Sequence, residues 1–224
     1  MRALDVETAQ NTTWDILGWM VERIGVFGGT FDPPHLGHLI LASEARAQLQ
    51  LDRLLWVLTS VPPHKLGQPI SALEDRLVML RLAVEQEPGF VISRVDINRP
   101  GPHYTVDTLK ILAKENPAAV LVLLLGGDSL HDLTTWHEPQ QLVAECSEIG
   151  VMRRPGALID LASLEKQIPG LTLKIRYVDA PLLEIASQQI RRRVANDQPF
   201  RYYVPKGVYE YIREKGLYRG DGPR

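Results

Sequence analysis

The stretch GVFGGTFDPPHLGHLILASEA, residues 25–45, carries the strongest structural signal in the chain. Its short apolar run ends at Gly28 and Gly29, which is typical of a buried strand followed by a sharp change of direction. Two prolines follow, just before a helix start, where proline is tolerated. Beyond them, apolar residues recur at helical spacing. The stretch therefore predicts a strand, a tight loop and a helix, which together form the opening unit of an α/β fold.

The same loop carries groups suited to binding an anion. His35 and His38 are three residues apart and can share one helical face. They lie at the helix start, where free N–H groups and the helix dipole favour negative charge. Gly28 and Gly29 allow close approach of a ligand to the backbone, and Gly37 leaves room for a flat group. We interpret the loop as a phosphate site with histidine donors, because two ordinary surface histidines would not account for the glycines and prolines.

Strands and helices alternate along the rest of the chain, so we expect an α/β, Rossmann-like, doubly wound, mostly parallel sheet. Helices would cover both faces, and a small helical segment would close the C-terminal end. Ser71 and Glu74 show the pattern of a capping box at the start of one helix. Besides the opening unit, strands are predicted at 53–60, 89–97, 118–126, 147–156 and 173–180, and helices at 72–86, 104–116, 187–197 and 205–216.

The composition excludes several classes of protein. The chain has 224 residues and a formal net charge of −2, which gives no basic field for nucleic acid. Its one cysteine, Cys146, excludes an internal disulfide framework, and no apolar run is long enough to span a membrane. The N-terminus lacks the pattern of a secretory signal. We therefore expect a cytoplasmic protein with no nucleic-acid or membrane partner; an oligomer is compatible with the sequence.

We expect one domain, at residues 23–218, preceded by an N-terminal extension at residues 1–22. In that extension, Trp14 and Trp19 are expected to pack on the domain. Polar residues follow the predicted strands in VPPHK, GGDS, TTW and EIASQQIRRR. Ligands of doubly wound sheets bind at the carboxyl ends of the strands, where the strand order reverses, so these segments predict a single site.

Common phosphate-binding and metal-binding motifs are absent from the sequence. It has neither the G-x-x-x-x-G-K-[ST] pattern of P-loop NTPases nor the G-x-G-x-x-G pattern of dehydrogenases. The two loop histidines could contribute to a zinc site, but no third protein ligand is evident. No protein-bound metal site is therefore predicted.

The sequence resembles the nucleotidyltransferases with an H-x-G-H signature and, among them, the bacterial nicotinate-nucleotide adenylyltransferases. The pieces that carry the resemblance are GGTFDPPHLGH, VPPHK, HYTVDTL, GGDSLHDLTTWH, RRPG and IASQQIRRRV. The combination of YTVDTL with GGDSL…W narrows the resemblance to the nicotinate-nucleotide adenylyltransferases. The resemblance implies adenylyl transfer from ATP to nicotinate mononucleotide, by in-line attack of the substrate phosphate, as a step of NAD biosynthesis. Pyrophosphate and deamido-NAD would be the products, and Mg²⁺ would be carried mainly by the ATP phosphates.

The resemblance also implies three groups of site residues. Those implied in catalysis are His35, His38, Lys65 and Arg191. Those implied in ATP binding are Gly28, Gly29, Thr30, Phe31, Gly37, Asp128 and Ser187. Those implied in binding the pyridine nucleotide are Tyr104, Thr105, Trp136 and Arg154. Some have simpler interpretations: Lys65 as a solvated loop lysine, Asp128 as a helix N-cap and Trp136 as a structural tryptophan.

The last motif departs from the family pattern, which is usually I-S-S-T-x-I-R. Ala186 stands in place of the first serine and Gln188 in place of the threonine, whereas Ser187 and Arg191 remain. One hydroxyl donor is lost, although an amide also donates. Three alternatives stay open: an adenylyltransferase acting on nicotinamide mononucleotide, one acting on phosphopantetheine, and a non-catalytic nucleotide sensor.

Overall fold

The computed structural model describes residues 21–60, 69–152, 159–181 and 183–219. Trp14 and Trp19, which we expected to pack on the domain, lie outside the described residues. So do Lys65 and Arg154, two of the predicted site residues.

The described residues form a six-stranded sheet in the order β3-β2-β1-β4-β5-β6, and every pair of neighbours is parallel. This confirms the doubly wound fold, and strand order reverses between β1 and β4. The strands are β1 Arg23–Gly29, β2 Arg53–Leu58, β3 Phe90–Ser93, β4 Val120–Gly126, β5 Glu148–Met152 and β6 Ile175–Val178.

The longer helices follow the predicted pattern, whereas several short ones were not predicted. The predicted helices are α1 Leu36–Gln48, α2 Leu73–Val84, α3 Thr105–Glu115, α8 Ser187–Ala195 and α9 Lys206–Lys215. The additional segments are α4 Gly127–His131, η2 Leu133–Thr135, α5 Pro139–Glu145, α6 Leu161–Gln167, α7 Leu171–Lys174 and η3 Arg201–Tyr203. These segments are too short to show a clear helical period.

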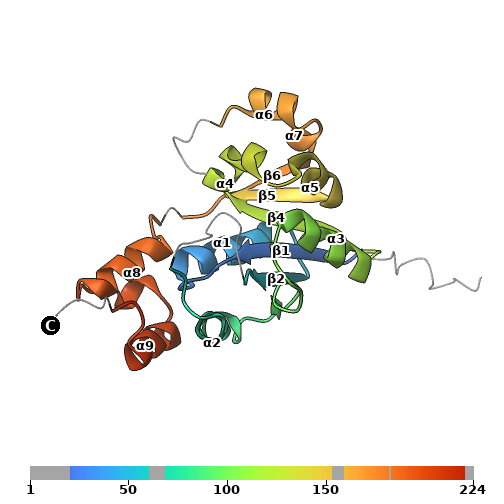
Figure 1. Cartoon of the computed structure of the whole chain (residues 1–224). Helices are drawn as coiled ribbons and strands as arrows, with labels where there is room; N and C mark the ends of the chain where they lie inside the picture. The colour runs from blue at the N-terminus through green and yellow to red at the C-terminus, as the bar shows by residue number, and fades with distance from the viewer. Residues whose placement is uncertain (1–20, 61–68, 153–158, 182, 220–224) are drawn as a thin grey trace, which may run out of the picture.

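Helices cover both faces of the sheet (Figure 1). One core cluster joins α1 and α2 to the sheet around the fully buried Trp56, and the other joins α3 and α5 to the opposite face. Strand β4 contributes side chains to both clusters, because Leu123 belongs to one and Leu124 to the other. It is thus the central strand that its two-sided apolar pattern predicts. None of the described helices is long and apolar enough to cross a membrane.

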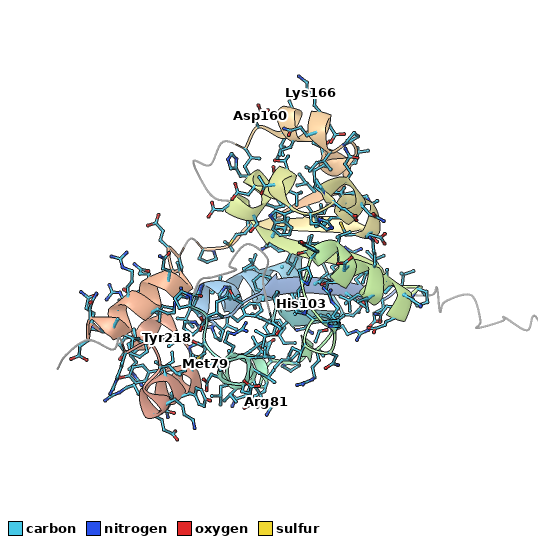
Figure 2. The ribbon with its side chains drawn as sticks, viewed as in Figure 1. Met79, Arg81, His103, Asp160, Lys166 and Tyr218 are labelled. Atoms are coloured by element: carbon cyan, nitrogen blue, oxygen red, sulfur yellow. The ribbon has the colours of Figure 1, made fainter. Side chains whose placement is uncertain are left out.

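The C-terminal helices α8 and α9 form a separate cluster that docks on α2 (Figure 1). Met79 of α2 is fully buried against Ile190 of α8 and Val208 of α9. Tyr218, just beyond α9, lies beside Met79, with its hydroxyl 3.8 Å from the methionine sulfur (Figure 2). The small helical segment predicted for this end of the chain is therefore present.

The predicted capping box at the start of α2 is wrong. The N-cap is Ala72, which makes no side-chain cap bond, and the helix begins at Leu73. The backbone of Ser71 is engaged elsewhere: its N–H donates to Asp32 Oδ2 at 3.1 Å, and its carbonyl accepts from Arg76 Nε at 3.0 Å. These two contacts hold the Ser71 backbone outside the helix.

At the N-terminal end, Glu22 joins the sheet although we placed it in the extension. Its carboxylate accepts from Arg53 Nε at 2.7 Å, and its carbonyl accepts from the N–H of Val120 at 2.8 Å. The contacts of the domain therefore begin no later than Glu22.

Candidate active site

Two glycines mark the point where the strand order reverses. Gly28 lies near the end of β1 and Gly126 at the end of the neighbouring β4. A Cβ atom added to either residue would meet nothing within 4 Å. Open space therefore lies above these two strands, where doubly wound folds bind ligands.

Gly29 and Phe31 shape the loop that follows β1. A Cβ at Gly29 would lie 2.9 Å from the Phe31 ring. Phe31 itself has a φ of 45°, and its ring is 2% exposed, packed against Phe27 and Trp56. We predicted a contact of Phe31 with ATP. The structure instead turns its ring into the core and edge-on to His38, 5.2 Å between centroids.

His35 and His38 cap the start of α1 reciprocally. The N–H of His35 donates to His38 Nδ1 at 3.2 Å, and the N–H of His38 donates to His35 Nδ1 at 3.4 Å. The two rings stack with centroids 3.6 Å apart. Because each Nδ1 accepts a backbone hydrogen, the proton of each neutral ring belongs on Nε2. Both histidines are thereby prepared to donate from Nε2.

Burial keeps His35 neutral. The residue is 6% exposed, and desolvation lowers its pKa to about 4. Gly37 makes this placement possible, because a Cβ there would lie 3.1 Å from His35 Nδ1. We expected Gly37 to leave room for a ligand; in the structure the space that a side chain would take there is bordered first by the His35 ring.

Helix α8 lies against the same loop. Ser187, its first residue, donates from Oγ to the carbonyl of Pro33 at 2.9 Å, and Arg191 donates from Nη1 to the carbonyl of Asp32 at 2.7 Å. Neither α1 nor α8 has an acidic residue in its first turn, and the N-cap Ala186 of α8 makes no side-chain cap bond. Two helix N-termini, two imidazoles and a guanidinium thus gather around one loop, which suits a polyphosphate.

On the β4 side, Asp128 is exposed in the first turn of α4. The N-cap of this helix is Gly126, so the interpretation of Asp128 as the N-cap is wrong. A carboxylate at this edge of the sheet is placed to accept from ribose hydroxyls.

Two of the residues predicted to bind the pyridine nucleotide, Tyr104 and Thr105, lie at the start of α3, and a third, Trp136, lies shortly before α5. Tyr104 is the N-cap of α3, and its ring stacks on His137 with centroids 4.0 Å apart and an interplanar angle of 25°. Trp136 directly precedes His137 and is partly buried against the core. Thr105 is the first residue of α3. Sequence reasoning missed His137, although it lies within the quoted motif GGDSLHDLTTWH.

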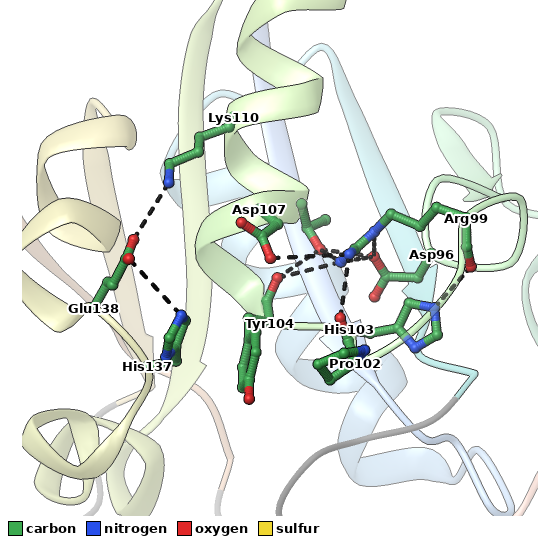
Figure 3. A network of polar contacts seen from close by, with 10 residues as sticks. Asp96, Arg99, Pro102, His103, Tyr104, Asp107, Lys110, His137 and Glu138 are labelled. Atoms are coloured by element: carbon green, nitrogen blue, oxygen red, sulfur yellow. Dashed lines mark hydrogen bonds and ion pairs between the residues drawn. The ribbon is translucent and has the colours of Figure 1, made fainter.

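A buried network behind Tyr104 was also missed (Figure 3). Asp96 is 2% exposed, and its Oδ1 accepts from Arg99 Nη2 at 3.0 Å and from Thr108 Oγ1 at 2.7 Å. The same Arg99 nitrogen reaches the Tyr104 carbonyl at 3.3 Å. The network therefore fixes the start of α3. Its only sequence signal is that Asp96 and Arg99 lie three residues apart, opposite in charge.

Arg76, which is 2% exposed in α2, was also missed. Its guanidinium donates to four carbonyl oxygens, which belong to Thr30, Thr59, Ser60 and Ser71 at 2.8–3.3 Å. It thus joins the segments that follow β1 and β2 to the start of α2. A signal was present in the sequence, because Arg76 lies four residues before the buried Leu80 on an otherwise apolar stripe.

In the part of the chain that the structure describes, no three His, Cys, Asp or Glu residues are grouped closely enough to hold a metal ion. Cys146 is buried, and desolvation raises the pKa of its thiol to about 11. A thiolate nucleophile at this position is therefore disfavoured.

The fold and the loop chemistry define a nucleotidyltransferase, and a match to the cytidylyltransferase-like family model over residues 26–193 places the chain in that class. Relatives with similar sequences identify the family within this class. A protein of Thermomicrobium roseum named "Probable nicotinate-nucleotide adenylyltransferase" is 50% identical over 89% of this chain and 92% of its own length. A relative from Streptomyces coelicolor with the same name is 45% identical over 87% of this chain and its full length. The chain belongs to the nicotinate-nucleotide adenylyltransferase family.

Solved structures support the fold. The chain is similar to the nicotinic acid mononucleotide adenylyltransferase of Plasmodium falciparum, solved in complex with NaAD, with a TM-score of 0.72 and 21% identity. The likeness covers 88% of this chain and 97% of that one. The same protein in complex with APC gives a TM-score of 0.71.

Proposed function

We propose that the protein transfers the adenylyl group of ATP to nicotinate mononucleotide, releasing pyrophosphate and forming deamido-NAD, a step of NAD biosynthesis. The observation that carries the proposal is the pair of imidazoles at the start of α1, with both Nδ1 atoms engaged by backbone N–H groups. The proton of each neutral ring then lies on Nε2, the nitrogen that we assign to the phosphate. The family membership of the chain supports the same reaction.

The nucleophile in this reaction belongs to the substrate. The 5′-phosphate of nicotinate mononucleotide is an anion at neutral pH, so its in-line attack on the α-phosphorus of ATP needs no general base. Catalysis then consists of positioning the reactants and stabilising charge as pyrophosphate leaves. We assign the stabilisation near the α-phosphate to His35 and His38.

Helix α8 suits the leaving pyrophosphate. Ser187 and Arg191 lie at its start, and Arg191 uses Nη1 on the Asp32 carbonyl while a guanidinium carries further donors. We assign these two residues, with Lys65 on sequence grounds, to the β- and γ-phosphates. The adenosine would lie above Gly28 and Gly126, near Thr30 and Asp128.

We assign the pyridine nucleotide to the residues at the start of α3 and just before α5. Tyr104 and Thr105 at the start of α3 and Trp136 before α5 would hold it, with the stacked His137 supporting Tyr104. Arg154 is added from its place in the RRPG motif. Trp136 is half-buried, which leaves part of its ring for stacking on the pyridine.

Magnesium is expected to arrive bound to ATP. The described residues offer no cluster of acidic or histidine ligands, so this part of the chain fits an ion held by phosphate oxygens and water. Bound in that way, the ion neutralises charge on the triphosphate.

Pyrophosphate release from MgATP tests the proposal. Nicotinate mononucleotide, nicotinamide mononucleotide and phosphopantetheine would be supplied as acceptors in parallel reactions, with His38→Gln as the impaired control. We expect release with nicotinate mononucleotide alone. Release with both pyridine nucleotides would show that the carboxylate is not discriminated. ATP binding without release from any acceptor would contradict the proposal and favour a nucleotide sensor.

A further inference from the structure

Asp32 connects the histidine loop to three distant parts of the chain. It is 3% exposed and lies three residues before His35. Its Oδ1 accepts from the Tyr218 hydroxyl at 2.6 Å, its Oδ2 accepts from the N–H of Ser71 at 3.1 Å, and its carbonyl accepts from Arg191 at 2.7 Å. No other loop residue that the structure describes is shown bonded to three such separate segments.

Tyr218 reaches Asp32 from the opposite end of the chain, 186 residues away. Burial, followed by the Asp32 carboxylate, raises the pKa of the Tyr218 hydroxyl well above its usual range, so the group stays a donor at physiological pH. Tyr218 has a φ of 63°, and Phe31, directly before Asp32, has a φ of 45°. Such values cost energy in residues other than glycine and persist where surrounding contacts enforce them.

The chain between Asp32 and His35 is stiff. Its two residues are Pro33 and Pro34, whose rings fix φ. A displacement of Asp32 is therefore passed to the His35 backbone rather than absorbed between them. On the other side of the loop, Arg76 holds the carbonyl of Thr30 at 3.3 Å.

We propose that the hydrogen bond from Tyr218 to Asp32 positions the histidine pair for adenylyl transfer, which makes Tyr218 and Asp32 positioning residues for the reaction. Neither side chain needs to touch a substrate. The hydrogen bond from the Tyr218 hydroxyl fixes the position of Asp32. Because Pro33 and Pro34 are stiff, the position of Asp32 in turn fixes those of His35 and its stacked partner His38. This inference rests on the proposed function, because the loop is assigned to the α-phosphate of ATP.

Tyr218→Phe tests the proposal, and Tyr211→Phe is a matched control. Tyr211, in α9, donates to Asp75 Oδ1 in α2 at 2.8 Å. Both substitutions therefore remove one tyrosine–aspartate bond between the C-terminal unit and the rest of the domain. Only Tyr218 reaches the histidine loop. The measurements are kcat and both KM values with MgATP and nicotinate mononucleotide, and the melting temperature.

We expect Tyr218→Phe to lower kcat about 10-fold with KM values changed less than about twofold, because small misplacements of catalytic groups slow the chemical step. Tyr211→Phe should keep the kcat of the unmodified protein. A kcat of Tyr218→Phe within about twofold of the unmodified protein would overturn the proposal. So would equal losses of kcat in both variants, or a change confined to KM.

A second measurement separates this proposal from the proposed reaction. In substrate-free protein, the imidazole Cε1–H resonances of His35 and His38 should shift in Tyr218→Phe and stay in place in Tyr211→Phe. Unshifted resonances in Tyr218→Phe would overturn the positioning role. If the unmodified protein releases no pyrophosphate with any acceptor, the proposed function fails while this measurement still decides whether Tyr218 sets the histidine pair.

Discussion

His38 combines two roles that substitution can separate: it caps the start of α1, and its imidazole is the group that we assign to the phosphate. Gln at this third helical position still supports a reciprocal cap, whereas Ala does not. We expect both His38→Gln and His38→Ala to lower kcat by about 10²–10³, the usual effect of removing one donor to a developing charge. Steady-state kinetics and thermal melting would be measured together.

The two His38 variants should differ in stability, because only His38→Ala loses the cap, at a cost of about 1 kcal/mol. Near-normal turnover in His38→Gln would remove the imidazole from the reaction. A loss of turnover in His38→Ala alone would show that capping, rather than donation to phosphate, is its role.

The lowered pKa of His35 predicts a pH dependence of stability. The folded protein holds this imidazole neutral down to a pH of about 4, whereas the unfolded chain binds a proton below about 6.5. The unfolded state therefore binds more protons between these values, so stability falls as the pH drops from about 6.5 toward about 4. The shift corresponds to about 3 kcal/mol lost across that window.

His35→Asn isolates this contribution, because Asn is also a favoured N-cap and does not titrate. Denaturant midpoints at pH 7.5 and 4.5 would be compared between the two proteins. The variant is expected to lose less stability on acidification. Equal losses in both would show that His35 is not the neutral, buried group described above.

At the scale of the element, the end of β1 offers a pair of neighbouring glycines with opposite surroundings. A methyl group at Gly28 meets open space, whereas one at Gly29 collides with the Phe31 ring at 2.9 Å. Gly28→Ala is expected to keep the melting temperature while raising KM for ATP, because the methyl group enters the space assigned to adenosine. Gly29→Ala is expected to lower the melting temperature through overpacking. An unchanged KM in Gly28→Ala would place the nucleotide elsewhere.

The sequence was most informative about elements with long, regular patterns. The end of strand β1 at the glycine pair and the helical spacing of α1 were predicted from one stretch, and helices were predicted at the places of α3 and α9. The predictions failed where contacts from outside a local sequence pattern prevent that pattern from forming. The Ser71–Glu74 capping box does not form, because Asp32 and Arg76 hold the Ser71 backbone, and both partners lie outside the four residues of the capping pattern.

The candidate site was predictable to the extent that its chemistry lies in contiguous motifs. His35 and His38 appear in one short stretch, and their location at a helix start is confirmed. Tyr218 carries no motif, and the only signal for Arg76 is a charge on an apolar stripe, because their contacts with the loop depend on which segments the sheet topology brings together. The stacking of Tyr104 on His137 was likewise beyond local patterns.

At the scale of the whole molecule, the strands of the parallel sheet span Arg23 to Val178, and every predicted site residue lies between Gly28 and Arg191. Deleting residues 1–20 is therefore expected to leave kcat unchanged. The predicted packing of Trp14 and Trp19 on the domain implies that the same deletion lowers the melting temperature. Kinetics and melting of the shortened protein would be compared with those of the full chain. A fall in kcat without a fall in melting temperature would contradict both expectations.

The bond between Asp32 and Tyr218 also has a consequence for biosynthesis. Its two ends are separated by 186 residues, so the loop that forms early in translation cannot be completed until nearly the whole chain exists. At usual rates of synthesis the interval is about 10–40 s. During that time β1 and α1 can already pack, since their contacts are local by comparison. If this bond positions the histidine pair as proposed, a nascent chain halted before Tyr218 would be folded in large part and yet turn over substrate more slowly than the complete chain.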